Sequence, residues 1–433
     1  MKRLLRIVLT GLALANLAVS ALRLVPLRSS TWGIRVWFMK LSAGALAPFM
    51  AVAGVVGGLL GMGLRAPLAM MAGLGSAILS ARYVRDVLAQ GVDYAPLFGP
   101  GWQEQIQARR TPAMLDRRWS WRLPADPEAD FQQDVVYATV PGTERALLCD
   151  LWQPSAGVAP SGVGVIYCHG SGWYLSDKDV GTRPFFQHLA AQGHVVMDVA
   201  YRMCPETNLE GMVADVKRAV VWMKSHGAEL GVNPARVVLS GGSAGAHLAM
   251  LSAFVPDHPQ LTPPDLADTD LSVGAIFSFY GPPDMRATAE HNGSIGFSAY
   301  RADLAVEPTQ PPARRSKAWQ EYQQLQWQRI GNLAWDMFGG SEDEVPERYD
   351  LGSPIHHVHA GIPPTLLIQG EQDILVSATS VGILYERMVA AGAPVAYLGL
   401  PNTDHAFDLV MPHLSPPSQN AWYEVDRFLA LVR

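Results

Sequence analysis

The chain has 433 residues and a formal net charge of −6, from 33 basic and 39 acidic residues. This length accommodates one large catalytic domain and an additional segment. Because the balance is mildly acidic, no global positive field is present, and nucleic acid is excluded as an expected partner. Cys149, Cys168 and Cys204 are too few and too scattered for a disulfide framework or a zinc site. We expect three buried thiols.

The first part of the chain, residues 1–81, is predicted to be a membrane segment with two or three transmembrane helices. Its second apolar stretch carries no charge and exceeds the ~20 residues that cross a bilayer. A cleaved signal peptide explains only the first stretch. A helical hairpin in a soluble protein would need polar residues on the side that faces water, and this segment has hardly any. The three apolar stretches are Ile7–Leu22, Leu41–Leu64 and Ala66–Ala81.

Two features of this segment bear on its packing and orientation. The pairs Gly54/Gly58 and Gly57/Gly61 have the spacing of small residues that lets membrane helices approach closely. With three spans, more basic residues lie on the side of the carboxy-terminal part, which favours a cytoplasmic catalytic domain. These are Arg23, Arg28, Arg35, Lys40, Arg82 and Arg85, against Lys2, Arg3, Arg6 and Arg65 on the other side.

Residues 82–129 are interpreted as a connector and residues 130–433 as the catalytic domain. The connector contains paired arginines beside tryptophans, which fits either a membrane surface or a linker that packs on the domain. After it, β-branched runs alternate with amphipathic stretches, which predicts an α/β fold with a mostly parallel sheet and helices on both faces. The expected strands are Asp134–Val140, Arg145–Trp152, Gly162–Cys168, His194–Tyr201, Arg236–Leu239, Val273–Phe279, Thr365–Gln369 and Val395–Leu400.

Two local features modify this pattern. Pro141, Gly142 and Thr143 form a turn signal between the first two strands, which predicts an antiparallel start. Residues 285–338 form a long polar excursion between two strands. An excursion of this length predicts a cap-like insertion over a site, although a peripheral insertion fits equally.

The stretch VVLSGGSAGAHLAM, residues 237–250, places Ser243 between an apolar strand and a helix. Gly241 and Gly245 flank the serine at two residues on either side. This G-x-S-x-G pattern in a strand–turn–helix context is typical of a nucleophile elbow, in which a sharp turn leaves no room for neighbouring side chains. The pattern is not a phosphate-binding loop, because no Gly-Lys-Ser/Thr follows. Ser243 is therefore the candidate nucleophile.

A serine nucleophile needs a base, and the base needs an orienting carboxylate. Asp373 follows the strand Thr365–Gln369, and His405 follows the strand Val395–Leu400. Their order after the serine and their positions after strand ends match the order of a Ser-Asp-His triad on a doubly wound sheet. The competing carboxylates are Glu371 and Asp404, and the competing base is His413.

Four further histidines are interpreted as structural. His356, His357 and His359 have no acidic or thiol partner at ligand spacing, so we expect a surface turn and no metal site. His247 lies on the elbow helix and is expected to be a packed core residue.

The segment His169–Trp173, with Gly170, Ser171 and Gly172, follows the strand Gly162–Cys168. Small residues leave backbone N–H groups free to point at a reacting oxygen, so this loop is a candidate oxyanion loop. Taken alone, it would be an ordinary glycine turn.

Together with Tyr201, Arg202, Pro205 and Glu206, these motifs resemble the hormone-sensitive-lipase-like esterases of the α/β-hydrolase superfamily over residues 130–433. The resemblance implies that the family's HGGG loop and elbow supply three backbone oxyanion donors, which fall on Ser171, Gly172 and Ala244. Ser171 departs from the family's usual glycine. The resemblance also implies that the Tyr201–Glu206 stretch supports the structure, and it does not explain the membrane segment.

We therefore predict a membrane-anchored serine carboxylesterase or lipase with the triad Ser243, Asp373 and His405. It needs no cofactor or metal, and its partners are a small-molecule or lipid ester and the membrane. Alternatives are an arylformamidase or amidase, or an acyltransferase, with the same triad. A catalytically silent membrane binding module is a further alternative, and it would require a broken triad. The oligomeric state is left open.

Overall fold

The computed structural model describes residues 1–27, 31–123, 127–170, 172–292 and 333–432. Its centre is an eight-stranded sheet in the order β1-β2-β4-β3-β5-β6-β7-β8. Strand β2 runs antiparallel to β1 and β4, and the other pairs are parallel. All expected strands and the antiparallel start are confirmed. The strands are β1 (Asp130–Thr139), β2 (Ala146–Gln153), β3 (Gly162–Cys168), β4 (Val195–Ala200), β5 (Val232–Gly242), β6 (Ala275–Phe279), β7 (Thr365–Gly370) and β8 (Val395–Leu400).

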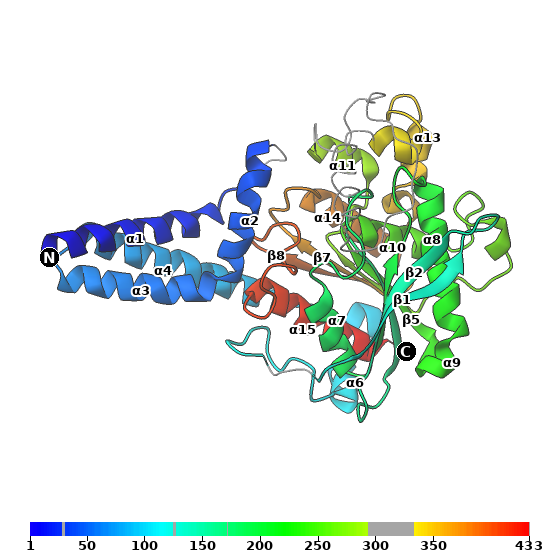
Figure 1. Cartoon of the computed structure of the whole chain (residues 1–433), viewed down its shortest axis with the longest axis horizontal. Helices are drawn as coiled ribbons and strands as arrows, with labels where there is room; N and C mark the ends of the chain where they lie inside the picture. Colours follow the sequence, from blue (N-terminus) through cyan, green and yellow to red (C-terminus); the bar gives the residue numbers. More distant parts are fainter. Residues whose placement is uncertain (28–30, 124–126, 171, 293–332, 433) are drawn as a thin grey trace.

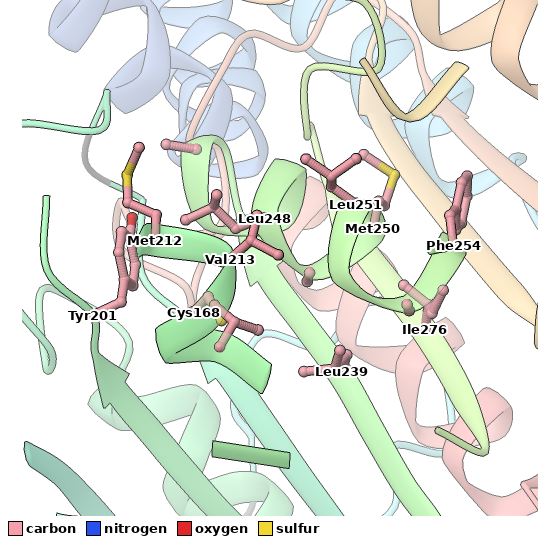
Figure 2. Close-up of a cluster of buried hydrophobic side chains, with 14 of the residues drawn as sticks. Cys168, Tyr201, Met212, Val213, Leu239, Leu248, Met250, Leu251, Phe254 and Ile276 are labelled. Carbon is pink, nitrogen blue, oxygen red and sulfur yellow. The ribbon is translucent and has the colours of Figure 1, made fainter. Parts of the chain in front are cut away.

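Helices cover both faces of this sheet, as the sequence predicted (Figure 1). Buried strands send alternate side chains to opposite faces, so each face needs its own apolar cover. Figure 2 shows Met212, Val213, Leu248 and Leu251 packed with Leu239 of the sheet. One face carries α8 (Leu209–Ser225), α10 (Ala244–Phe254) and α14 (Ala378–Ala390), and the other carries α7 (Arg183–Ala191) and α15 (Pro416–Leu431).

The amino-terminal segment forms a helical arm that projects from this body (Figure 1). A Cβ on Gly54 would lie 2.6 Å from the backbone oxygen of Gly73, so two helices meet there at backbone distance. Gly58 and Gly61 are also buried against the facing helix, whereas Gly57 has nothing within 4 Å. Of the two predicted glycine pairs, Gly54/Gly58 therefore lies in the contact. The arm consists of α1 (Lys2–Leu22), α3 (Ala47–Gly63) and α4 (Pro67–Leu88).

The second apolar stretch differs from the expected single helix. It is divided between α2 (Thr31–Ala45) and α3, which are bent by 76° relative to each other. Pro48 lies in the first turn of α3, where its missing N–H leaves no intrahelical bond unmade. Among the described helices, α1 is long and apolar enough to cross a membrane, and the α2–α3 pair reaches the same criterion only as one bent span.

The connector packs on the body. Arg118 forms an ion pair with Glu424 of α15 at 3.1 Å, and the N–H of Leu115 donates to Asp426 at 2.9 Å. The indole of Trp119 donates to the carbonyl of Leu414 at 3.0 Å. Of the two interpretations, a linker packed on the domain matches these contacts. The connector contains the short helices α5 (Ala95–Phe98) and α6 (Trp102–Arg109).

The excursion after β6 begins with α11 (Met285–Asn292) and ends with the π-helical turn η4 (Ala334–Phe338). Residues 293–332, most of the expected cap-like insertion, lie outside the described residues. The described start of the excursion reaches the loop that follows β7, because the ring of His291 forms a hydrogen bond with the carbonyl of Asp373 at 3.1 Å. The remaining described helices are α9 (Gly227–Leu230), η1 (Pro264–Leu266), α13 (Pro346–Leu351) and η5 (Pro354–His357).

Candidate active site

Ser243 stands at the turn between β5 and α10 with φ 53° and ψ −123°. A non-glycine residue with this positive φ is strained, and such strain is characteristic of a nucleophile elbow. The turn is held because the N–H of Ser243 donates to the carbonyl of Phe279 at 2.9 Å. A Cβ on Gly245 would lie 2.0 Å from the carbonyl oxygen of Cys168, so the close approach of α10 to β3 requires glycine there.

The structure brings Ser243, His405 and Asp373 together in one chain of hydrogen bonds. The His405 Nε2 lies 2.9 Å from the Ser243 Oγ, and the His405 Nδ1 lies 2.8 Å from the Asp373 Oδ2. A carboxylate can only accept, so Nδ1 carries the proton in this pair and Nε2 is left to accept from the serine hydroxyl. His405 is 3% and Asp373 5% exposed, so these bonds lie away from bulk water.

Asp373 is fixed by the loop that follows β7. Its Oδ1 accepts from the N–H groups of Leu375 and Val376 at 2.8 and 2.7 Å. Its Oδ2, the atom that faces His405, also accepts from the side-chain amide of Gln369 at 3.1 Å. Together these donors hold the carboxylate in one orientation.

The His405 ring lies near aromatic rings from two distant parts of the chain. The ring of Tyr280, after β6, lies 4.4 Å from the His405 ring, and the ring of Trp37 in α2 lies 6.2 Å from it. The Tyr280 hydroxyl donates to Asp408. Burial raises the pKa of Asp408 to about 6, opposed by the hydrogen bond from Tyr280.

The candidate oxyanion loop is placed against the elbow. A Cβ on Gly170 would lie 3.1 Å from the carbonyl oxygen of Gly242, so the loop and the elbow are in close contact. Gly172 has φ 56°, a value that glycine adopts readily, and Ala244 is fully buried at the start of α10. Ser171 lies outside the described residues.

A hydrogen-bonded relay ties this loop to the elbow helix. The Trp173 indole N–H donates to Nδ1 of His247 at 3.1 Å, and Nε2 of His247 pairs with the carbonyl of Gly352 at 2.6 Å. Burial lowers the pKa of His247 to about 4, opposed by its bond to Gly352, so the ring is neutral near pH 7. His247 is buried as expected, and it also has defined partners on both sides.

The other motif residues have structural contacts. The His169 ring stacks on Tyr201 at 4.7 Å, and the Tyr201 hydroxyl donates to the His169 carbonyl at 2.9 Å. Arg202 binds Asp215 of α8 at 2.7 Å. Glu206 pairs with Arg145, also at 2.7 Å.

The competing residues have other contacts. Glu371 and His413 are exposed, and the His413 ring lies against Trp422 instead of the serine. Asp404 faces Lys40. His356 pairs with Asp350, whereas His357 and His359 bond the carbonyls of Leu351 and Phe254. In the part of the chain that the structure describes, no group of three or more His, Cys, Asp or Glu residues could hold a metal ion.

Sequence reasoning missed the contribution of the amino-terminal segment to this site. Trp37 and Lys40 lie in a stretch interpreted only as membrane-associated, and no local pattern distinguishes them from interfacial residues. Tyr280 and Asp408 were also missed. Their only signal is their position just after the strand β6 and just after His405, where side chains reach the same edge of a parallel sheet.

The sheet order, the antiparallel β2 and the elbow after β5 define an α/β-hydrolase fold. The BD-FAE family profile, which is hormone-sensitive-lipase-like, matches residues 149–388. The chain belongs to this family, which confirms the expected superfamily.

Among curated relatives, the chain is 28% identical to the probable carboxylic ester hydrolase LipM of Mycobacterium tuberculosis over 290 residues, 66% of this chain and 59% of LipM. It is 28% identical to the esterase LipQ of the same organism over 328 residues, 74% of this chain and 68% of LipQ. The chain thus spans about three fifths of LipM and two thirds of LipQ. A solved structure of Thermogutta terrifontis esterase 2 with propionate bound is 24% identical, covers 71% of this chain and 95% of its own, and has a TM-score of 0.48.

Proposed function

We propose that the protein is a serine hydrolase of carboxylic esters. The observation that carries the proposal is the unbroken hydrogen-bonded chain from Ser243 Oγ through His405 to Asp373, with distances of 2.9 and 2.8 Å. Relatives that are named carboxylic ester hydrolase and esterase support the ester class. A silent binding module would not need an ordered nucleophile, base and acid on a strained elbow.

The distances support the following role for each group. His405 Nε2 takes the proton of the Ser243 hydroxyl as the serine oxygen bonds to the ester carbonyl carbon. Asp373 holds the imidazole in place and stabilises its positive charge. The backbone N–H groups of Ser171, Gly172 and Ala244 then bind the negative oxygen of the tetrahedral intermediate. The N-terminus of α10 adds a positive dipole end at the same position.

The intermediate collapses when His405 returns the proton to the leaving alkoxide, which departs as an alcohol and leaves an acyl-serine. Water then attacks the acyl carbon as His405 takes one of its protons. Breakdown of the second tetrahedral intermediate releases the carboxylic acid and restores the serine hydroxyl. His405 carries out every proton transfer, so this sequence needs no organic cofactor.

The test is the Ser243→Ala variant assayed with p-nitrophenyl esters and a fluorophosphonate probe. We expect ester turnover to fall by at least about three orders of magnitude and labelling to be lost. The matched control is Ser252→Ala on the same helix, since the Ser252 hydroxyl has no hydrogen-bond partner within the described residues. Ester turnover that survives in Ser243→Ala would contradict the proposal. Faster release from an arylformamide, or a rate that rises with an added alcohol acceptor, would reassign the same triad to the amidase or acyltransferase alternative.

We further propose that the arm of α1, α3 and α4 lies in a membrane. Its helices turn small residues inward, as Gly54, Gly58 and Ala69 are buried, while large apolar side chains point outward. This arrangement suits a lipid bilayer, because helix association within a bilayer depends on close packing of small residues. The outward residues include Leu5, Ile7, Leu12, Val52, Val56, Leu59, Leu68, Met71 and Ile78.

Extraction distinguishes this arrangement from peripheral attachment. We expect the full chain to stay in the membrane pellet in alkaline carbonate and to enter solution only with detergent. Release by carbonate alone would contradict the proposal.

The cytoplasmic side of the catalytic domain stays a prediction. Arg23 and Lys40 are buried in the protein, so four of the counted basic residues remain on each side of the membrane. The charge balance then favours neither orientation. Protease protection in vesicles of known sidedness is the direct measurement.

A further inference from the structure

The amino-terminal segment reaches the catalytic loops directly. Helix α2 stands where the arm meets the body, close to the end of β8 (Figure 1). From this helix Trp37 approaches the ring of His405, and Leu41 is buried in the same apolar cluster as Phe407. A segment that only attached the enzyme to a membrane would not need contacts of this kind with the base.

Lys40 of α2 makes the polar part of this contact. Its Nζ lies 2.9 Å from the Oδ2 of Asp404, and both side chains are 1% exposed. The same ammonium donates to the Oε1 of Gln372 at 2.9 Å. Asp404 and Gln372 directly precede the base His405 and the acid Asp373, so one lysine binds both loops beside their catalytic residues.

Asp404 joins the two loops through its other oxygen. The Oδ1 accepts from the N–H of Ile374, next to the acid, and from the N–H of His405 itself, each at 2.8 Å. The loops are also joined by the N–H of Gln372, which donates to the carbonyl of Thr403 at 2.9 Å. An ionised carboxylate accepts such bonds about twice as strongly as a neutral acceptor. The strength of the hydrogen bonds that join the two loops therefore depends on the charge of Asp404.

The buried position opposes that charge. Burial raises the pKa of Asp404, and the charge of Lys40 and its hydrogen bond act in the opposite direction. Without the ammonium, the carboxylate would be a buried charge beside another carboxylate, Asp373, and would protonate or draw in water.

We propose that Lys40 is a positioning residue for catalysis: by pairing with Asp404 it keeps the backbones of Ile374 and His405 in the relation that lets His405 bridge Asp373 and Ser243. The inference rests on the proposed esterase function and deepens it. It makes the amino-terminal segment part of the catalytic apparatus. Substrate contacts Ser243, and Lys40 acts only through Asp404.

The test compares Lys40→Met, Asp404→Asn and their double variant in the full chain, with kcat expressed per serine titrated by fluorophosphonate. We expect each single variant to lower kcat by about 10- to 100-fold with KM within about threefold, because substrate binding is not touched. The double variant should be no slower than the slower single variant, since the two residues act as one unit. Lys40→Arg should restore kcat to within about tenfold of wild type, because it restores the charge.

The pH profile provides a readout that a purely structural role would not move. In Lys40→Met the acid limb of kcat/KM should stay near its wild-type pH, because Asp404 takes up a proton when the ammonium is removed and the local charge is unchanged. Removing the negative charge should shift it to lower pH in Asp404→Asn. The other titratable groups that face this region are the same in both variants: Asp373, Tyr83, Arg23, Tyr280 and Asp408.

The matched control is Arg118→Met, which removes another ion pair between the amino-terminal part and the body, Arg118–Glu424 at 3.1 Å. It should reduce stability and leave kcat per titrated serine unchanged. A wild-type kcat in Lys40→Met would overturn the inference. If that variant does not fold, a wild-type kcat in the near-isosteric Asp404→Asn does the same. Failure of the esterase proposal is distinct, because it appears as turnover that survives in Ser243→Ala.

Discussion

The indole N–H of Trp173 donates to Nδ1 of His247 at 3.1 Å, and this bond joins the loop after β3 to the helix that follows Ser243. Because an indole nitrogen can only donate, His247 must accept at Nδ1 and carry its proton on Nε2, which faces the carbonyl of Gly352. The proposed oxyanion donor Gly172 directly precedes Trp173. We therefore predict that His247 helps to orient the N–H of Gly172.

Replacing His247 with alanine should release this loop. We expect kcat for ester hydrolysis to fall by about 10- to 100-fold, less than or comparable to the loss of one oxyanion donor. Steady-state kinetics with p-nitrophenyl esters gives the measurement. His413→Ala is the matched control, because His413 is exposed and its ring lies against Trp422. Equal activity in both variants would show that the relay does not position the loop.

Asp408 should make the folded state less stable as the pH rises from ~4 to above ~6. Burial raises its pKa to about 6, from an ordinary value near 4. The folded state therefore holds this proton more tightly than the unfolded chain, and the stability gained below pH ~4 is lost as the pH rises through ~6. The difference amounts to roughly 3 kcal/mol at most. Asp408→Asn keeps an acceptor for the Tyr280 hydroxyl, so we expect its Tm in detergent to exceed wild type at pH 8 and to match it at pH 4. A lower Tm at pH 8 would argue against this account.

Gly245→Ala should disrupt the elbow. Its new methyl group would lie 2.0 Å from the Cys168 carbonyl oxygen, a backbone atom that cannot move without shifting β3. We expect a loss of several kcal/mol in the free energy of unfolding, or no folded protein, together with lost labelling by fluorophosphonate. The control is Gly382→Ala in α14, where a Cβ meets nothing within 4 Å and should add about 0.5–1 kcal/mol of stability. Folded, labelled Gly245→Ala protein would contradict the close approach.

Gly54→Val should separate the helices of the arm. Its side chain would occupy the position 2.6 Å from the Gly73 carbonyl oxygen where α3 meets α4. We expect a lower Tm in detergent by several degrees and little change in kcat per titrated serine, because the contact lies in the arm. Gly57→Val is the control, since Gly57 has nothing within 4 Å. If the two variants melt alike, these helices do not pack as described.

The sequence by itself determined the sheet, the elbow and the chain order of the candidate triad residues. Strand alternation, the glycine spacing around Ser243 and the positions of Asp373 and His405 after strand ends are all local properties. Parallel strands bring their carboxyl ends to one edge, so this order was enough to expect the serine, the acid and the base at one site.

Only the tertiary structure decided what the amino-terminal segment does at that site. Lys40 and Gln372 are 332 residues apart, and a lysine between apolar residues reads in the sequence as a residue at a membrane surface. Helix α2, which is bent by 76° relative to α3, carries this lysine to the loops that contain Asp373 and His405. Hydrophobic periodicity describes the face of one helix, whereas an ion pair with Asp404 depends on which surface that face meets.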